Sequence, residues 1–165
     1  MSSENDPRLQ QRLDMVENQI RRRSVRDERV FDALIRIPRH LFVPKNLQSQ
    51  AYDDCPLPIG YSQTISQPYI VALMTELVRP EPSDRALDIG TGCGYQAAIL
   101  AELVQHVCSI EIVDQLANGG RMVIPIGRSS QELLFIEKSQ DGAIKRTTFA
   151  PVAFVPMTRE AQKKK

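Results

Sequence analysis

The chain lacks several features that mark specialised classes of protein. Its 165 residues contain no tryptophan, 5% aromatic residues, two histidines and three cysteines, and the cysteines do not have C-x-x-C spacing. This composition argues against a metal site or a disulfide framework, and it favours a reducing, cytoplasmic compartment. No apolar run has the length of a membrane-spanning helix, and no signal-peptide pattern opens the chain.

An excess of charge of either sign is also lacking. The chain has 21 basic and 20 acidic residues and a net charge of +1, so no overall field attracts nucleic acid or a membrane surface. A hydrophobic content of 42% is typical of a soluble globular protein. We therefore expect residues 1–165 to form a single, monomeric domain with a core of its own.

Glycine is scarce except in one stretch, where Gly90, Gly92 and Gly94 alternate with other residues. An apolar segment, Arg85–Ile89, precedes these glycines, and a helix rich in small residues follows them. This order predicts a strand, a glycine loop and a helix whose N-terminus faces a nucleotide. The dinucleotide pattern G-x-G-x-x-G fails from Gly90 because residue 95 is tyrosine. A weaker G-x-G-x-x-A pattern from Gly92 leaves a nicotinamide oxidoreductase open.

Two acidic residues flank this loop at informative distances. Asp88 lies two positions before the first glycine, and Glu111 ends the next expected strand, 23 positions after Asp88. A carboxylate at the second position can accept hydrogen bonds from both ribose hydroxyls of an adenosyl ligand. The stretch 88–94 resembles the S-adenosyl-L-methionine (AdoMet) loop of class I methyltransferases.

The segment before this unit predicts three helices. Asp6 is expected to cap the first, whose apolar stripe is Leu9, Leu13, Val16 and Ile20. The second is expected over 27–37, stopped by Pro38, with an extended connector over 39–44. We expect His40, on this connector, to be a surface or packing residue rather than a catalyst.

The segment 55–68 is long for a featureless connection, and such loops are often functional. It places Ser66 at the start of the third expected helix, 68–78. Two interpretations of this serine stay open. Ser66 or Gln67 can cap the helix, or the hydroxyl of Ser66 can hold a substrate carboxylate at a helix start that favours anions.

Taken together, the motifs resemble the protein-L-isoaspartate O-methyltransferase family. The resemblance implies AdoMet-dependent methylation of the abnormal carboxylate of L-isoaspartyl residues in damaged proteins and peptides. It implies that Ser66 is the active-site hydroxyl and that Ile65 and Gln67 bind substrate. The residues that it assigns to AdoMet are Asp88, Gly90, Thr91, Gly92, Gly94 and Glu111. The stretches that carry the resemblance are 51–53, 58–60, 63–68 (QTISQP), 88–94, 106–111, 119–127 and 154–158.

One departure from the family is large. The family has several tens of residues between the Glu111 strand and the Gly-Gly-Arg strand, whereas Val113 is separated from Gly119 here by five residues. A parallel crossover usually needs a dozen or more. Because Asn118-Gly119 favours a hairpin, we expect the two strands around the join to pair antiparallel. The resemblance implies that the absent residues hold a strand whose acidic turn lies beside adenine, a central strand and helices. We therefore also expect three apolar side chains to be under-covered, those of Ile99, Leu103 and Ile124.

The sequence thus predicts an α/β domain, a truncated class I (Rossmann-like) AdoMet-dependent methyltransferase fold with an N-terminal helical section. Its expected parts are a helical substrate section (6–78), an AdoMet-binding unit (84–113) and C-terminal strands (119–158). In the last part, strands are expected over 131–137 and 143–156, and Pro151 indicates a sheet edge or bulge. Two further alternatives stay open: another class I methyltransferase, and a non-catalytic remnant that only binds or assembles.

Overall fold

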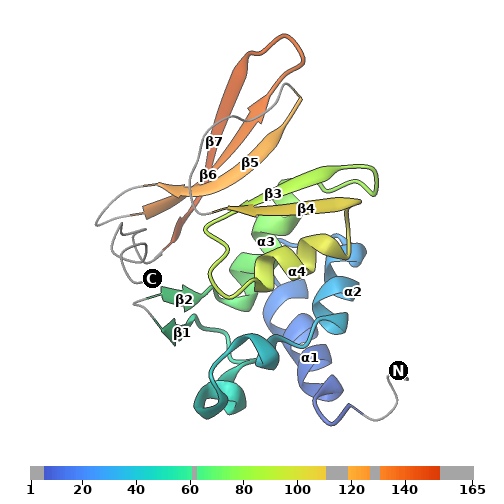
Figure 1. Ribbon diagram of the computed structural model, residues 1–165, viewed down its shortest axis with the longest axis vertical. Coiled ribbons are helices and arrows are strands. Elements are labelled where there is room, and N and C mark those ends of the chain that lie inside the picture. The colour runs from blue at the N-terminus through green and yellow to red at the C-terminus, as the bar shows by residue number, and fades with distance from the viewer. Residues whose placement is uncertain (1–5, 61–62, 111–118, 127–130, 153–165) are drawn as a thin grey trace.

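The computed structural model describes residues 6–60, 63–110, 119–126 and 131–152 (Figure 1). The N-terminal part is mainly helical, and the remainder alternates between strands and one helix. The helices are α1 (Leu9–Met15), which continues as the π-helix η2 (Val16–Arg21), α2 (Glu28–Arg36), the 3₁₀ helices η3 (Arg39–Phe42) and η4 (Lys45–Gln50), α3 (Pro68–Leu77) and α4 (Tyr95–Ala101). The strands are β1 (Leu57–Gly60), β2 (Gln63–Ile65), β3 (Arg85–Ile89), β4 (His106–Ile110), β5 (Arg121–Ile126), β6 (Gln131–Lys138) and β7 (Ile144–Val152).

The first helix differs in detail from the prediction. It begins at Leu9, and the carboxylate of Asp6 accepts a hydrogen bond from the backbone N–H of Arg8 (2.9 Å) rather than capping the helix directly. Leu13 is 39% exposed, and Arg12 is buried in its place, with its guanidinium paired to Asp6 at 2.7 Å. Val16 and Ile20 are buried as predicted. The prediction is wrong at Leu13, whose place on the buried face Arg12 takes, because an ion pair allows an arginine stem to pack inward.

The second helix is confirmed, but the connector after it is not extended. The carboxylate of Asp27 accepts a hydrogen bond from the backbone N–H of Arg29 (2.9 Å) and caps α2. The connector forms the 3₁₀ helix η3, in which the N–H of Leu41 donates to the carbonyl of Pro38 (2.9 Å). The turn places the guanidinium of Arg39 inside the protein, where its Nε donates to the carbonyl of Ala51 (2.7 Å). This buried contact outweighs the extended preference of the sequence.

The long segment before α3 contains a two-stranded hairpin that the sequence did not predict. β1 and β2 pair antiparallel, with Leu57 opposite Ile65. Both of these side chains are buried in the core. Because the strands are only four and three residues long, their alternation is too brief to give a clear period in the sequence.

The central unit is the predicted strand–loop–helix–strand. β3 and β4 pair in parallel, with Leu87 opposite Cys108. Figure 1 shows α1 to α4 on one side of this strand pair. Ile99 and Leu103 are 0% and 7% exposed, so the expectation that both would be under-covered is wrong, because the N-terminal helices pack against this part of the chain. The open face is the opposite one, where Leu87 is 46% exposed and Cys108 is also exposed.

The C-terminal strands form a separate antiparallel sheet in the order β5-β6-β7. Among the described residues β4 does not pair with β5, so the predicted antiparallel pairing across the join is wrong. β5 pairs with β6 instead, because this longer partner is available. Leu133 and Phe135 share a buried face of β6, as predicted. β7 is an edge strand of this sheet, and its register is irregular at Phe149, two residues before Pro151.

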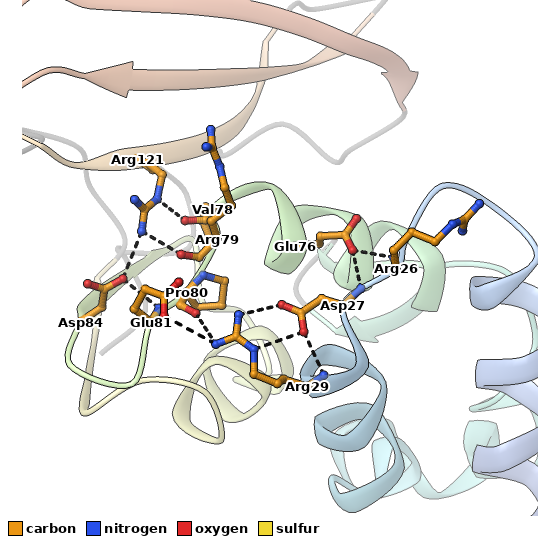
Figure 2. Close-up of polar contacts among 10 residues, drawn as sticks. All are labelled: Arg26, Asp27, Arg29, Glu76, Val78, Arg79, Pro80, Glu81, Asp84 and Arg121. Carbon is orange, nitrogen blue, oxygen red and sulfur yellow. Dashed lines mark hydrogen bonds and ion pairs between the residues drawn. The ribbon is translucent and has the colours of Figure 1, made fainter.

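The linker between α3 and β3 is a junction of three parts of the fold (Figure 2). Arg121 of β5 donates hydrogen bonds to the carbonyls of Val78 and Arg79 and contacts the carboxylate of Asp84 at 3.1 Å. From the other side, Arg29 of α2 donates to the carbonyl of Pro80 (3.0 Å). The linker thus connects the helical section and the C-terminal sheet to the start of β3.

Candidate functional site

The glycine loop after β3 depends on backbone conformations that side chains disfavour. Gly90, Gly92 and Gly94 have φ values of 80°, 52° and 83°. The N–H of Gly94 donates to the carbonyl of Thr91 (2.8 Å), which closes a tight turn immediately before α4. These left-handed conformations explain the alternating glycines, and they allow backbone N–H groups to face a ligand at the helix start.

The acidic partner on the same strand lies where the sequence predicted it. Asp88 is 8% exposed and is the one buried residue of β3, one position before the strand ends at Ile89. Glu111, the second predicted acid, lies outside the described residues, so its role stays a prediction. Cys93, inside the loop, is half-buried, and this burial raises the pKa of its thiol, which makes it a packing residue rather than a nucleophile.

The predicted substrate residues lie at the junction of β2 and α3. Ile65 is 3% exposed and anchors the end of β2 in the core. The side-chain amide of Gln67 donates to the carboxylate of Asp54 (2.8 Å) and to its carbonyl (3.0 Å). Neither Ser66 nor Gln67 caps α3 through its side chain, so the helix-cap interpretation is wrong. In the described part of the chain the half-buried hydroxyl of Ser66 makes no hydrogen bond, so it is available to a ligand.

The substrate segment and the glycine loop are in contact. A Cβ atom placed on Gly92 would lie 3.4 Å from Cδ1 of Ile59 and 4.0 Å from Oε1 of Gln63. The β1–β2 hairpin therefore packs against the loop that is expected to hold the cofactor. The tertiary structure brings together two motifs that are separated in the sequence, as a transfer reaction between two bound molecules requires.

A buried arginine supports this arrangement, and sequence reasoning missed it. Arg39 is 0% exposed, and its guanidinium lies 5.1 Å from the ring centre of Tyr95, the first residue of α4. Burial lowers the pKa of Arg39, and the aromatic face partly offsets the cost of burying its charge. The arginine therefore links the helical section to the helix that follows the glycine loop. A charged residue beside a proline gives no sequence signal for such a role.

His40, next to this arginine, is a packing residue as predicted. Its Nδ1 lies 2.7 Å from the hydroxyl of Tyr52, and burial lowers the pKa of His40. Where the structure describes the chain, no three histidine, cysteine or acidic side chains gather to hold a metal ion. No described helix is long and apolar enough to cross a membrane.

The fold and the site define an α/β protein of the class I methyltransferase type. A structure described as a beta-aspartate methyltransferase (PCMT) from Plasmodium falciparum in complex with S-adenosyl-L-homocysteine has the same fold. Its TM-score is 0.72 at 18% identity, with 90% of this chain and 99% of that chain covered.

The chain belongs to the protein-L-isoaspartate(D-aspartate) O-methyltransferase family, whose model matches residues 10–113 and 110–162. A protein-L-isoaspartate O-methyltransferase from Synechococcus sp. (strain JA-2-3B'a(2-13)) is 40% identical, with 92% of this chain and 87% of the relative covered. One from Methanoculleus marisnigri is 41% identical, with 93% and 94% covered.

The same comparisons confirm that this chain lacks an internal segment. The alignment with the Synechococcus relative extends over 213 positions, although this chain has only 165 residues. The two matches to the family model meet at residues 110–113, immediately after β4. The relative therefore carries residues at this point that the present chain does not have.

Proposed function

We propose that this chain transfers a methyl group from AdoMet to the carboxylate of L-isoaspartyl residues in damaged proteins and peptides, a repair reaction. The observation that carries the proposal is the position of Ser66. Its hydroxyl, which bonds to no residue among those described, lies between two anchored residues, on a segment whose hairpin contacts the glycine loop. Membership of the isoaspartate methyltransferase family supports this choice of substrate.

The residues of the loop fit an adenosyl cofactor. The left-handed backbone at Gly92 disfavours any side chain, and a Cβ there would already be in contact with Ile59; a glycine at such a position allows the backbone to approach a ligand closely. Asp88, Gly90, Thr91, Gly92, Gly94 and Glu111 would hold AdoMet. When bound, AdoMet supplies an already activated methyl group.

The protein's own contribution is to bind and align the substrate. An isoaspartyl carboxylate is ionised at neutral pH, so its oxygen needs no general base. We assign to Ser66 one hydrogen bond donated to this carboxylate, and to Ile65 and Gln67 the positioning of the segment that carries it. Alignment of the reacting atoms by such contacts can lower a barrier by several kcal/mol, so a histidine–aspartate pair is not required.

The proposal also covers the setting of the reaction. We propose that the three sections, 6–78, 84–113 and 119–158, act as one domain and that the enzyme is a cytoplasmic monomer. Three cysteines that form no disulfide support a reducing compartment. The balanced net charge of +1 supports partners that are isoaspartyl proteins and peptides rather than nucleic acid or membranes.

The test is a methyl-transfer assay with labelled AdoMet on an isoaspartyl peptide, with the same peptide carrying normal aspartate as the control. We expect label in the first peptide only. Calorimetric titration with AdoMet and with NAD separates this proposal from the nicotinamide alternative. Absence of transfer at enzyme concentrations comparable to the peptide would contradict the proposed function.

A further inference from the structure

We propose that Asp54 and Arg23 are positioning residues that close the open end of the β1–β2 hairpin and thereby hold Ser66 in place. This inference rests on the proposed function, because it assigns to these two residues a role in presenting the substrate hydroxyl. We name the arrangement of Arg23, Asp54 and Gln67 the clasp.

The clasp begins at the end of the hairpin that is away from its turn. The last pair of the ladder is Leu57 with Ile65, and beyond it the chain diverges towards Asp54 on one side and Gln67 on the other. The amide of Gln67 bridges this opening with hydrogen bonds to the carboxylate (2.8 Å) and the carbonyl (3.0 Å) of Asp54. These bonds continue the hairpin by side-chain contact where the backbone pairing has ended.

Such support matters because the hairpin is short. Isolated two-stranded hairpins are marginally stable in water, and as far as the chain is described β1 and β2 form a two-stranded sheet. Ser66 lies between the last paired residue of β2 and Gln67. With Ile65 anchored in the core and Gln67 held by Asp54, the backbone of Ser66 is fixed from both sides, and its hydroxyl makes no hydrogen bond to any described residue.

Arg23 holds the carboxylate of Asp54 in the orientation that Gln67 needs. The guanidinium of Arg23 forms an ion pair and hydrogen bond with Asp54, and it lies 4.5 Å from the ring centre of Tyr69. The hydroxyl of Tyr69 is in turn 2.8 Å from that of Ser24. The arginine is thus restrained by a ring on α3 and a carboxylate before the hairpin. Each Asp54 oxygen therefore has a distinct partner, Gln67 for one and Arg23 for the other.

A solvated ion pair without function is the alternative, since surface pairs contribute little to stability. The clasp requires an Asp54 side-chain oxygen to hold Gln67, whereas an ion pair without function does not. Asp54→Asn keeps an oxygen that can accept from Gln67, whereas Asp54→Ala removes it. Asp53→Ala is a matched control, because Asp53 is the exposed neighbouring carboxylate and has no side-chain partner in the described part of the chain.

The experiment compares these three variants with the unmodified chain by amide hydrogen exchange over 63–68 and by methyl transfer to an isoaspartyl peptide. We expect exchange to be about tenfold faster and kcat/KM about tenfold lower in Asp54→Ala, roughly the effect of losing one positioning hydrogen bond. AdoMet affinity should change less than about twofold. Asp54→Asn should recover most of both losses, and Asp53→Ala should change neither.

Unchanged exchange over 63–68 in Asp54→Ala would overturn the clasp, as would an equal loss of kcat/KM in Asp53→Ala. Arg23→Lys and Arg23→Met provide a second comparison, in which the lysine variant should retain more protection than the methionine variant. If the unmodified chain transfers no methyl group, the proposed function fails, while the exchange measurements still decide whether the clasp holds the segment around Ser66.

Discussion

At the scale of single residues, the feature of the site that bears most directly on function is the side chain of Ser66. Ser66 is anchored through its neighbours, and its hydroxyl makes no hydrogen bond in the described part of the chain. Serine at a helix start usually caps the helix, so its departure from that role is informative. A hydroxyl that does not serve the fold is available for a substrate.

Substituting this serine tests that interpretation. Ser66→Ala should lower kcat/KM on an isoaspartyl peptide by about ten- to a hundredfold, because one positioning hydrogen bond contributes on the order of 1–3 kcal/mol. AdoMet affinity, measured by calorimetry, should stay within a few-fold. Thr64→Ala, at an exposed position of β2, is the control. Equal turnover in Ser66→Ala and the unmodified chain would remove Ser66 from the mechanism.

Gly92 carries a second prediction at this scale. Gly92→Val should weaken AdoMet binding at least tenfold, because a Cβ there meets Ile59 at 3.4 Å and the backbone has φ of 52°. Glu111→Ala should also weaken binding by removing the expected ribose acceptor. Gly142→Ala, which alters another positive-φ glycine in the β6–β7 turn, controls for general strain. Calorimetry that finds unmodified affinity in both site variants would contradict the cofactor assignment.

Asp27 predicts a pH dependence of stability. Burial raises the pKa of Asp27, but hydrogen bonds from the side chain and backbone of Arg29 outweigh this effect and lower it below its ordinary value of 3.8. The carboxylate therefore stabilises the fold fully above that value, and the stabilisation is lost as the pH falls through the lower folded pKa. Asp27→Asn keeps the helix cap but should lower the free energy of unfolding at pH 7 by up to about 1 kcal/mol.

Urea titrations at pH 7 and at about pH 2 measure this difference, which should be smaller at the lower pH because the native carboxyl loses its charge as the pH falls through its lowered pKa. Asp32→Asn, an exposed position on the same helix, should have little effect at either pH. An equal loss at both values would show that the charge of Asp27 does not stabilise the fold.

At the scale of elements, the linker 78–84 determines how the C-terminal sheet is attached. Helices and strands from three parts of the chain meet there through arginine side chains and backbone carbonyls (Figure 2). The attachment matters because the chain lacks the segment that its relatives carry after β4. The side-chain contacts of Arg121 thus help to attach the C-terminal sheet in a chain that lacks this segment.

Removal of one arginine tests this attachment. Arg121→Met should lower the free energy of unfolding by about 2 kcal/mol, since three contacts from a partly buried guanidinium are lost. Limited proteolysis should cut more rapidly between β4 and β5. Arg146→Met, at an exposed position on β7, is the matched control. Equal proteolysis of both variants would show that Arg121 does not hold the sheet.

At the scale of the whole molecule, the described part of the chain leaves one face of the β3–β4 pair open. Parallel sheets are normally covered on both faces, yet Leu87 is 46% exposed and the paired Cys108 is exposed too. The helices cover the opposite face, which is why Ile99 and Leu103 are buried.

We expect this chain to bind AdoMet weakly and to turn over slowly. The resemblance to the family implies that the absent segment would cover adenine, and leaving an adenine face of on the order of 100 Å² in water costs about 2–3 kcal/mol. This corresponds to roughly one to two decades in affinity. Exposed apolar surface should also promote self-association.

The measurement compares this chain with one that carries a full-length family segment inserted between Val113 and Asp114. The longer chain should show higher AdoMet affinity, faster turnover and a higher Tm. Equal values of all three in the two chains would show that the short join is harmless.

The sequence by itself determined the local chemistry of this protein. Alternating glycines predict left-handed turns because only glycine adopts them without strain, and Asp27 predicts a helix start because its side chain can satisfy the first backbone N–H groups. The motif around Ser66 identified the family. These features depend on residues that are close together in the chain, so they can be predicted from the order of the amino acids.

Only the tertiary structure decided which distant segments meet. The clasp between Asp54 and Gln67, the contact of Ile59 with Gly92 and the burial of Arg39 join residues with no mutual signal in the sequence. The partner of β5 was also decided at this level, since strand pairing depends on which edges are available after the helices have packed. Local preferences are weak compared with burial and long-range hydrogen bonds, and these interactions exist only once the chain has folded.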